Sequence, residues 1–261
     1  PVVDIPALEE GAVAAVVLYH EQTQQECCAR NGKQQRQRPV AGIHRCPAKQ
    51  PQAGERQHLS HVTHVGLMNA DGSIAEMSGN GIRCLVAAVR RATHATWREL
   101  SVITLAGPRT VTLEMTSDTT GHGTGLMGTV TLLDAPEGSL GAADVGNPHV
   151  VILDNDAWTM ADRERVARTM QAAMPTGANV EFVTIQHPAR VAIKVYERGV
   201  GWTQACGTGS VATAAVLHSL GLTGPRAVVE NPGGELIVSL DGSQATLGGP
   251  VTFEGDMEWT L

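Results

Sequence analysis

The distribution of apolar residues divides the chain into an irregular first part and a regular second part. From about Leu67 onward, short runs rich in β-branched residues alternate with turns that contain glycine and proline, which is typical of strands in a packed sheet. We expect strands at residues 101–105, 109–115, 128–133, 149–153, 179–185, 192–196, 227–229, 235–240 and 245–247.

Two further segments have the spacing of helices. Residues 158–173 carry apolar side chains three to six positions apart. Residues 209–220 are a run of small and apolar residues that ends before Gly221, a typical helix C-cap. Helices interspersed with strands predict a mixed α/β (α+β) protein.

Residues 20–65 have almost no apolar period and are crowded with Gln, Arg, His, Cys and Pro. A disordered or loosely ordered segment accounts for this composition. A stretch of sequence recorded out of its reading frame also accounts for it, because a GC-rich gene read out of frame gives such a composition. Both interpretations stay open, and mass spectrometric sequencing of the intact protein separates them.

The composition narrows the class of protein. At 261 residues the chain is long enough for one large domain or two medium ones. A net charge of −7 and only 3% aromatic residues argue against nucleic acid as a partner. There is no run of about 18 apolar residues, and residues 1–4 do not resemble a signal peptide. We therefore expect no membrane partner and a cytoplasmic location, and the odd set of five cysteines indicates a reducing compartment.

Two short stretches look like copies of one loop. Residues 78–81 read Ser-Gly-Asn-Gly and residues 206–209 read Cys-Gly-Thr-Gly, and each is followed by an apolar run. A polar residue lies nine positions before each loop, Asn69 in one case and Glu197 in the other. Two such loops, one headed by a hydroxyl and one by a thiol, indicate two reactive groups that face one substrate.

The loop residues have a catalytic and a structural interpretation. Cys206 would lie at a helix N-terminus, where we expect a lowered thiol pKa and N–H groups that hold a carboxylate. The alternative is a buried structural cysteine. Ser78 is either an N-cap or the occupant of a catalytic position, where a hydroxyl is a weak acid or base. Asn147 and Asn179 are either turn residues or polar contacts for a ligand. His149 is a candidate for handling protons beside Asn147.

The sequence indicates neither a metal nor a nucleotide cofactor. His58, His61 and His64 are spaced by three, but no stable scaffold or paired cysteine motif accompanies them. Residues 79–83 lack the strand and the acidic partner of a dinucleotide-binding loop, and there is no P-loop.

Five motifs, in order over roughly residues 66–255, resemble those of the diaminopimelate epimerase family. They are residues 69–84 and 197–209, similar to its two active-site motifs, residues 146–149 and 179–182, similar to its substrate-binding motifs, and residues 105–109, similar to actinobacterial-type members. The resemblance implies two pseudo-symmetric halves, residues 1–134 and 135–261, each a barrel-like mixed sheet around a central helix. It also implies a cofactor-independent isomerase of lysine biosynthesis, which interconverts LL- and meso-diaminopimelate by means of two cysteines on opposite faces of the α-carbon. A small-molecule substrate is the implied partner, and a homodimer stays open.

Carried over to this chain, the resemblance makes Cys206 one catalytic acid/base and places Ser78 where the family has the other cysteine. Glu197 and His149 would tune the thiols. The residues that would bind the substrate are Asn69, Gly79, Asn80, Asn147, Asn179, Arg198, Gly207 and Thr208. Arg198 would hold a carboxylate through two parallel hydrogen bonds.

Three departures from the family pattern affect this interpretation. Ser78 replaces a cysteine, which predicts impaired epimerisation. Trp202 stands where a glutamate is usual, which predicts a disturbed loop before Cys206, and residues 1–65 lack the opening motif of the family. Two other functions stay open: a one-thiol relative of the proline racemase and hydroxyproline dehydratase type, and a ligand-binding homologue without catalytic activity.

Overall fold

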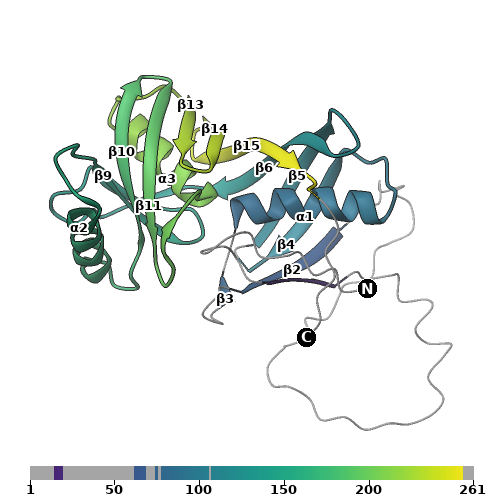
Figure 1. Cartoon of the computed structure of the whole chain (residues 1–261), viewed down its shortest axis with the longest axis horizontal. Coiled ribbons are helices and arrows are strands. Elements are labelled where there is room, and N and C mark those ends of the chain that lie inside the picture. Colours follow the sequence, from purple (N-terminus) through teal and green to yellow (C-terminus); the bar gives the residue numbers. More distant parts are fainter. Residues whose placement is uncertain (1–14, 20–61, 69–73, 76–77, 106, 255–261) are drawn as a thin grey trace, which may run out of the picture.

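The structure, a computed structural model, describes residues 15–19, 62–68, 74–75, 78–105 and 107–254 (Figure 1). These residues form three helices and one sheet of fifteen strands. The helices are α1 (Gly79–Ala92), α2 (Met160–Ala173) and α3 (Gly207–Ser219). The strands are β1 (Ala15–Tyr19), β2 (Val62–Met68), β3 (Ile74–Ala75), β4 (Glu99–Thr104), β5 (Gly107–Met115), β6 (Thr120–Thr129), β7 (Thr131–Leu133), β8 (Gly141–Asp144), β9 (Pro148–Leu153), β10 (Asn179–His187), β11 (Arg190–Glu197), β12 (Gly201–Thr203), β13 (Arg226–Asn231), β14 (Gly234–Asp241) and β15 (Gln244–Thr252).

The strands follow the order β1-β2-β4-β5-β6-β15-β14-β13-β11-β10-β9-β8-β7, with β3 added to β2 and β12 added to β11. Most neighbours are antiparallel, but β2 runs parallel to β4, β9 to β10, and β11 to β13. Parallel strands need a long crossover connection. Each of these three pairs is connected through one helix, so α1, α2 and α3 are the crossovers of a single sheet.

The middle of the sheet is completed by the last described strand in chain order. β15 pairs with β6 along residues 244–252 and with β14 along residues 244–248. It therefore joins strands from early and late parts of the chain. Figure 1 shows β15 and β6 between the strands around α1 and the strands around α3. Both helices also contact β15, so this strand is shared by the two groups.

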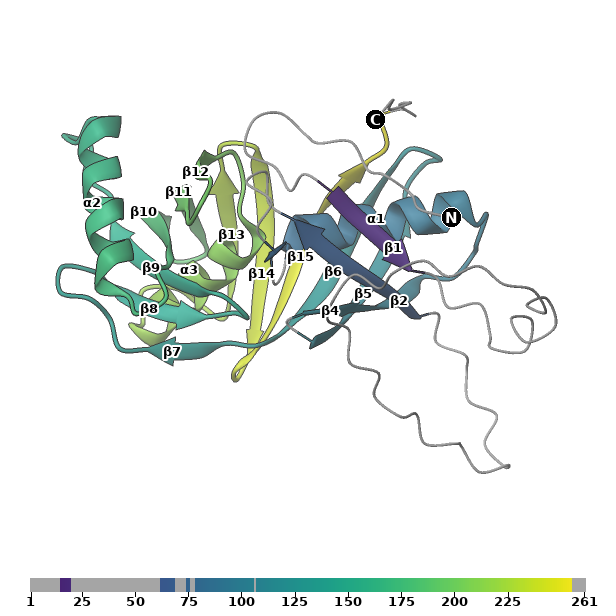
Figure 2. The same cartoon turned by 90° about the horizontal axis from the view of Figure 1, so that it is seen from below.

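One large cluster of buried apolar side chains includes both α1 and α3. Ile82 and Leu85 of α1, and Val211 and Leu217 of α3, belong to it and are almost completely buried. α3 is buried on all sides, which explains why its sequence shows no amphipathic pattern. A second cluster around Phe182 is covered by α2, which Figure 2 shows at the opposite end of the molecule from α1.

The mixed α/β architecture expected from the sequence is confirmed, as are helices at 158–173 and 209–220 to within a few residues. The single strand expected at 128–133 is wrong, because the chain divides there into β6 and β7. Gly128 has a positive φ of 87°, and the pairing of β6 with β15 shifts register beside it. The first part of β6 and all of β8 were not expected, since their glycines and alanines give no strand pattern.

The structure does not test the expectations for residues 20–61 or for the division of the chain into halves. Residues 20–61, with both interpretations of their composition, lie outside the described residues. The division of the chain into halves at residue 134 stays a prediction. No helix in the described part of the chain has both the length and the apolar character needed to cross a membrane.

A buried ion pair holds α2 against the sheet. The side chain of Asp154, just after β9, is 1% exposed and accepts hydrogen bonds from Arg163 Nε of α2 and Lys194 Nζ of β11, both at 2.7 Å. Burial alone would raise the pKa of Asp154, but the hydrogen bonds from the two cations outweigh it and lower the pKa below its usual value.

We expect Asp154→Asn to lower the free energy of unfolding at neutral pH by about 3 kcal/mol, because Arg163 would stay buried without its counter-ion. Since the folded pKa is depressed, Asp154 stabilises the fold above its unfolded pKa of about 3.9 and loses this effect as the pH falls through the folded value. Urea unfolding at neutral and at acid pH should show the difference between wild type and variant shrinking in acid. Glu164→Gln, which removes an exposed ion pair with Arg168, is the control, and equal losses in both variants would contradict this account.

Candidate active site

Ser78 and Cys206 are the N-cap residues of α1 and α3. Their backbones have nearly the same conformation, with φ −136° and ψ 112° at Ser78 and φ −130° and ψ 112° at Cys206. Ser78 Oγ accepts a hydrogen bond from the Gly81 N–H at 3.0 Å, and Cys206 Sγ accepts one from the Gly209 N–H at 3.4 Å. The two loops that look alike in sequence therefore have the same fold, down to the side-chain cap.

The two helix starts touch at glycines. A Cβ atom added to Gly207 would lie 3.0 Å from Gly79 Cα and 3.3 Å from the backbone nitrogen of Asn80. Leu247 of β15 would lie 2.8 Å from a Cβ at either glycine, so a side chain at these positions would push the loops apart. The first N–H groups of a helix have no acceptor within the helix and carry partial positive charge. Two such starts in contact suit the carboxylate of a small ligand.

Cys206 is held by its backbone as well as by its helix. Its N–H donates to Asn231 Oδ1 at 3.1 Å, and its carbonyl oxygen accepts from Ser210 Oγ at 2.8 Å. Asn231 Nδ2 donates in turn to Ser210 Oγ at 3.2 Å, which closes the network. Thr208 Oγ1 lies 3.5 Å from Cys206 Sγ. Sequence reasoning missed Asn231 and Ser210, because Asn231 lies at the end of β13, far along the chain from any motif.

Two buried carboxylates act on the Cys206 thiol. Burial, followed by the charges of Glu197 and Glu181, raises the pKa of Cys206 well above its usual value, although the N–H of Gly209 acts in the opposite direction. The lowered thiol pKa expected from the helix N-terminus is therefore wrong. Desolvation and the like charge of two carboxylates outweigh the helix start.

Glu197 is the carboxylate with the larger effect on this thiol. The charge of Glu197 is the larger of the two that raise the pKa of Cys206, and Glu197 Oε1 accepts a hydrogen bond from Thr203 Oγ1 at 2.7 Å. Burial raises the pKa of Glu197, while Thr203 and His149 act to lower it. Glu197 is therefore a better proton acceptor than an exposed carboxylate, and it lies close enough to act on the charge of the thiol.

His149 lies between Asn147 and Glu181. Its Nδ1 is 2.7 Å from Glu181 Oε1 and its Nε2 is 3.0 Å from Asn147 Oδ1. The side chains of His149 and Glu181 are both 0% exposed. Glu181 was not selected from the sequence, because its only signal was its place in a strand that otherwise reads as apolar.

Asn179 and Arg198 meet at the rim of the same region. The N–H of Arg198 donates to Asn179 Oδ1 at 2.9 Å, and Arg198 Nη1 donates to the carbonyl oxygen of Thr176 at 2.7 Å. Glu197 is the last residue of β11, and Arg198 is the first residue of the turn that follows. The role of Arg198 in holding a carboxylate stays a prediction.

A buried arginine orients Asn80. Arg83 is 4% exposed, and it donates to Asn80 Oδ1 at 3.0 Å and to the carbonyl oxygen of Gly79 at 3.1 Å. Because Oδ1 is engaged, the amide N–H groups of Asn80 are the part left to meet a ligand. Arg83 was also missed from the sequence. Asn69, the remaining candidate for substrate binding, lies outside the described residues.

Trp202 has a packing role of its own. It lies in β12 and packs against Phe182 and Tyr196, with ring centroids 5.8 Å and 5.2 Å away. The next residue, Thr203, donates to Glu197. The expected disturbance of the Cys206 loop by Trp202 stays a prediction.

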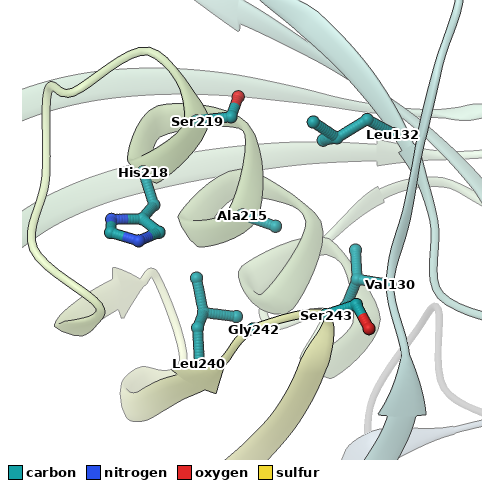
Figure 3. A pocket seen from close by; sticks show the side chains of 8 residues that line it. All are labelled: Val130, Leu132, Ala215, His218, Ser219, Leu240, Gly242 and Ser243. Carbon is teal, nitrogen blue, oxygen red and sulfur yellow. The ribbon is translucent and has the colours of Figure 1, made fainter.

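The histidines considered as metal ligands and the cavity at the end of α3 are separate from this site. Within the described part of the chain, no three His, Cys, Asp or Glu side chains gather where a metal ion could bind, and His58 and His61 lie outside it. A cavity of about 290 Å³ lies at the C-terminal end of α3, where Figure 3 shows Ala215, Val130 and Leu240 around it. The reacting groups of the candidate site lie at the other end of that helix.

Solved structures share this fold. A hydroxyproline epimerase from Agrobacterium vitis matches with a TM-score of 0.59 at 16% identity, over 77% of this chain and 71% of that chain. A predicted epimerase from Pseudomonas aeruginosa matches with a TM-score of 0.57 at 11% identity, over 75% of this chain and 80% of that chain. At these identities the likeness establishes the fold alone, and it confirms the expected fold class.

Proteins related by sequence are more similar to this chain than these structures are. A diaminopimelate epimerase from Mycolicibacterium vanbaalenii is 37% identical over 216 residues, which are 75% of this chain and 73% of that protein. One from Mycobacterium ulcerans is 38% identical over 199 residues, which are 72% of this chain and 69% of that protein. The family model of diaminopimelate epimerase matches residues 49–133 and 141–254. The chain therefore belongs to the diaminopimelate epimerase family.

Proposed function

We propose that this protein is a cofactor-independent isomerase that interconverts LL- and meso-diaminopimelate by inverting one α-carbon. The observation that carries the proposal is the junction of α1 and α3, where Gly79 and Gly207 touch and Ser78 and Cys206 cap the two helices in one conformation. Inversion requires one group that removes a proton from one face and another that delivers a proton to the opposite face. Two capped helix starts in contact supply two such positions around one carboxylate.

Cys206 is the base on one face. Glu197 takes the thiol proton, and the resulting thiolate removes the α-proton of the substrate. The α-ammonium group of the substrate is a cation, so its arrival would oppose the carboxylate charges that raise the pKa of Cys206. As the α-proton leaves, negative charge builds up on the substrate carboxylate, and the N–H groups of both helix starts stabilise it.

Ser78 occupies the corresponding position on the other face. Its hydroxyl is far less acidic than a thiol, so it delivers a proton slowly and is a poor base in the reverse direction. We therefore propose that proton transfer is efficient on the Cys206 face and impaired on the Ser78 face.

The remaining polar residues are proposed to bind the substrate. The Asn80 amide, with Gly79, Gly207 and Thr208, would hold the reacting carboxylate and ammonium groups at the helix starts. Asn147, Asn179 and Arg198 would hold the distant amino-acid end, with Arg198 on its carboxylate. His149 would tune proton transfer from its position beside Asn147.

We further propose a homodimer and a cytoplasmic location. Leu132 of β7 is 53% exposed, and β7 ends the described sheet, so a second copy could pair along this edge. A thiol that must stay reduced for proton transfer fits a reducing compartment. Analytical ultracentrifugation of the whole chain tests the dimer.

Ser78→Cys should raise the rate of epimerisation roughly 10²–10⁴-fold, since general acid–base catalysis at one position is worth about that much. Chiral chromatography of LL- and meso-diaminopimelate after incubation measures the rate. Ser78→Ala is the matched control, which removes the hydroxyl without supplying a thiol and should not gain activity. A fast wild-type enzyme that gains nothing from Ser78→Cys would overturn the assignment of Ser78.

Exchange with deuterated solvent should depend on the stereoisomer. In wild type, Cys206 can remove the α-proton of one isomer and return a deuteron to the same face, so we expect that isomer alone to gain deuterium, with retention. Ser78→Cys should label both isomers, and Cys206→Ala should label neither. Mass spectrometry of each isomer, incubated separately, measures the label.

Two parallel incubations test the competing functions. Hydroxyproline should show neither exchange nor dehydration, whereas dehydration would favour the one-thiol relative. Calorimetry that detects diaminopimelate binding without exchange of either isomer would favour a ligand-binding homologue. Equal labelling of both isomers by wild type would refute the impaired Ser78 face.

A further inference from the structure

Among the described residues, Glu181 is a buried carboxylate whose charge acts on Cys206 and to which the proposed reaction gives no role. It lies on β10 beneath the start of α3, where its Oε1 would be 2.5 Å from a Cβ atom at Gly209. Its side chain is 0% exposed, Oε1 contacts His149, and Oε2 is buried without a hydrogen-bond partner. A buried carboxylate with one unsatisfied oxygen is costly, and such groups in native proteins are often kept for function.

The contact with His149 fixes where a proton lies. An ionised carboxylate only accepts hydrogen bonds, so Nδ1 of His149 must carry the hydrogen that it shares with Glu181 Oε1 at 2.7 Å. The ring is then fixed at both ends, because Nε2 lies 3.0 Å from the side-chain amide of Asn147, which can accept a hydrogen bond through Oδ1 or, turned over, donate one through Nδ2. The parallel register of β9 and β10 pairs His149 with Asn179 and thereby brings Glu181 within reach of the ring.

The same carboxylate also acts on the thiol. Glu197 and Glu181 are the carboxylates whose charges reach Cys206, and Glu197 in turn senses both Glu181 and His149. These four groups come from β9, β10, β11 and the start of α3, and His149, Glu181 and Cys206 are buried. Glu181 is the member that contacts the His149 ring and also packs under the Cys206 loop.

We propose that Glu181 is a positioning residue that holds the proton on Nδ1 of His149 and couples His149 to the Cys206 loop. It touches neither the substrate nor the reacting carbon. The catalytic importance of Glu181 depends on the proposed function of the protein. The contacts themselves can be tested without any substrate.

Glu181→Gln keeps the size and one acceptor oxygen of the side chain but removes its charge. Loss of a negative charge near the thiol favours the thiolate, so the pH midpoint for alkylation of Cys206 by iodoacetamide should fall by roughly one unit. Mass spectrometry of the Cys206 peptide separates this reaction from alkylation of the other cysteines. Asp154→Asn is the matched control, since it removes another buried carboxylate, one that is bound to Arg163 and Lys194, and it should leave the midpoint unchanged.

Two outcomes overturn the proposal. One is an alkylation midpoint in Glu181→Gln equal to that of wild type, even if the exchange rate falls, because Glu181 would then act through packing alone. The other comes from wild type, so it does not depend on the folding of a variant. ¹⁵N NMR of the histidine side chains should show His149 with a protonated Nδ1, and an unprotonated Nδ1 would refute the assignment. Failure of the proposed function would look different, with no exchange of diaminopimelate but the expected midpoint shift and NMR signal.

Discussion

The contact between Gly79 and Gly207 fixes how far apart the two capped helix starts lie, and the rest of the site is arranged around it. With no side chain between them, the loops approach until backbone meets backbone, and Leu247 of β15 closes the remaining space. Ser78 and Cys206 each precede one of these glycines. Their relative position is therefore set by backbone contact, which is more rigid than contact between long side chains.

Two opposing electrostatic effects meet at Cys206. The start of α3 favours negative charge on the sulfur, while burial and the carboxylates of Glu197 and Glu181 disfavour it, and the second set is stronger. A thiol held in its protonated form is a poor nucleophile toward oxidants and electrophiles. In the proposed mechanism, this protection of the thiol would last until a cationic substrate changes the balance of charge around it.

The fold and part of the site could be predicted from the sequence. The remaining site residues could not be predicted, for a physical reason. The loops at Ser78 and Cys206 were found because each carries its own local signal, a capping residue followed by glycines and an apolar run. Glu181, Asn231 and Arg83 carry no such signal. Their roles depend on partner residues that strand register or packing brings close to them. Neither the register nor the packing can be read from the sequence. The pKa of Cys206 was misjudged for the same reason, since the helix start is local while both carboxylates arrive from other strands. The first part of β6 was missed because glycines take the alternate buried positions Gly123 and Gly125, where a strand pattern would show apolar side chains.

The position of β15 in the chain has a consequence for the folding of the newly synthesised protein. β15 lies beside β6 and supplies Leu247, which packs against both helix starts, yet it follows every other described strand in the order of translation. A nascent chain that ends before residue 252 contains the residues of α1 and α3 but cannot finish the strand that contacts both helices. The two reactive loops therefore reach their final spacing only after the ribosome has released this segment, and a chain truncated before β15 would hold both loops without an assembled site.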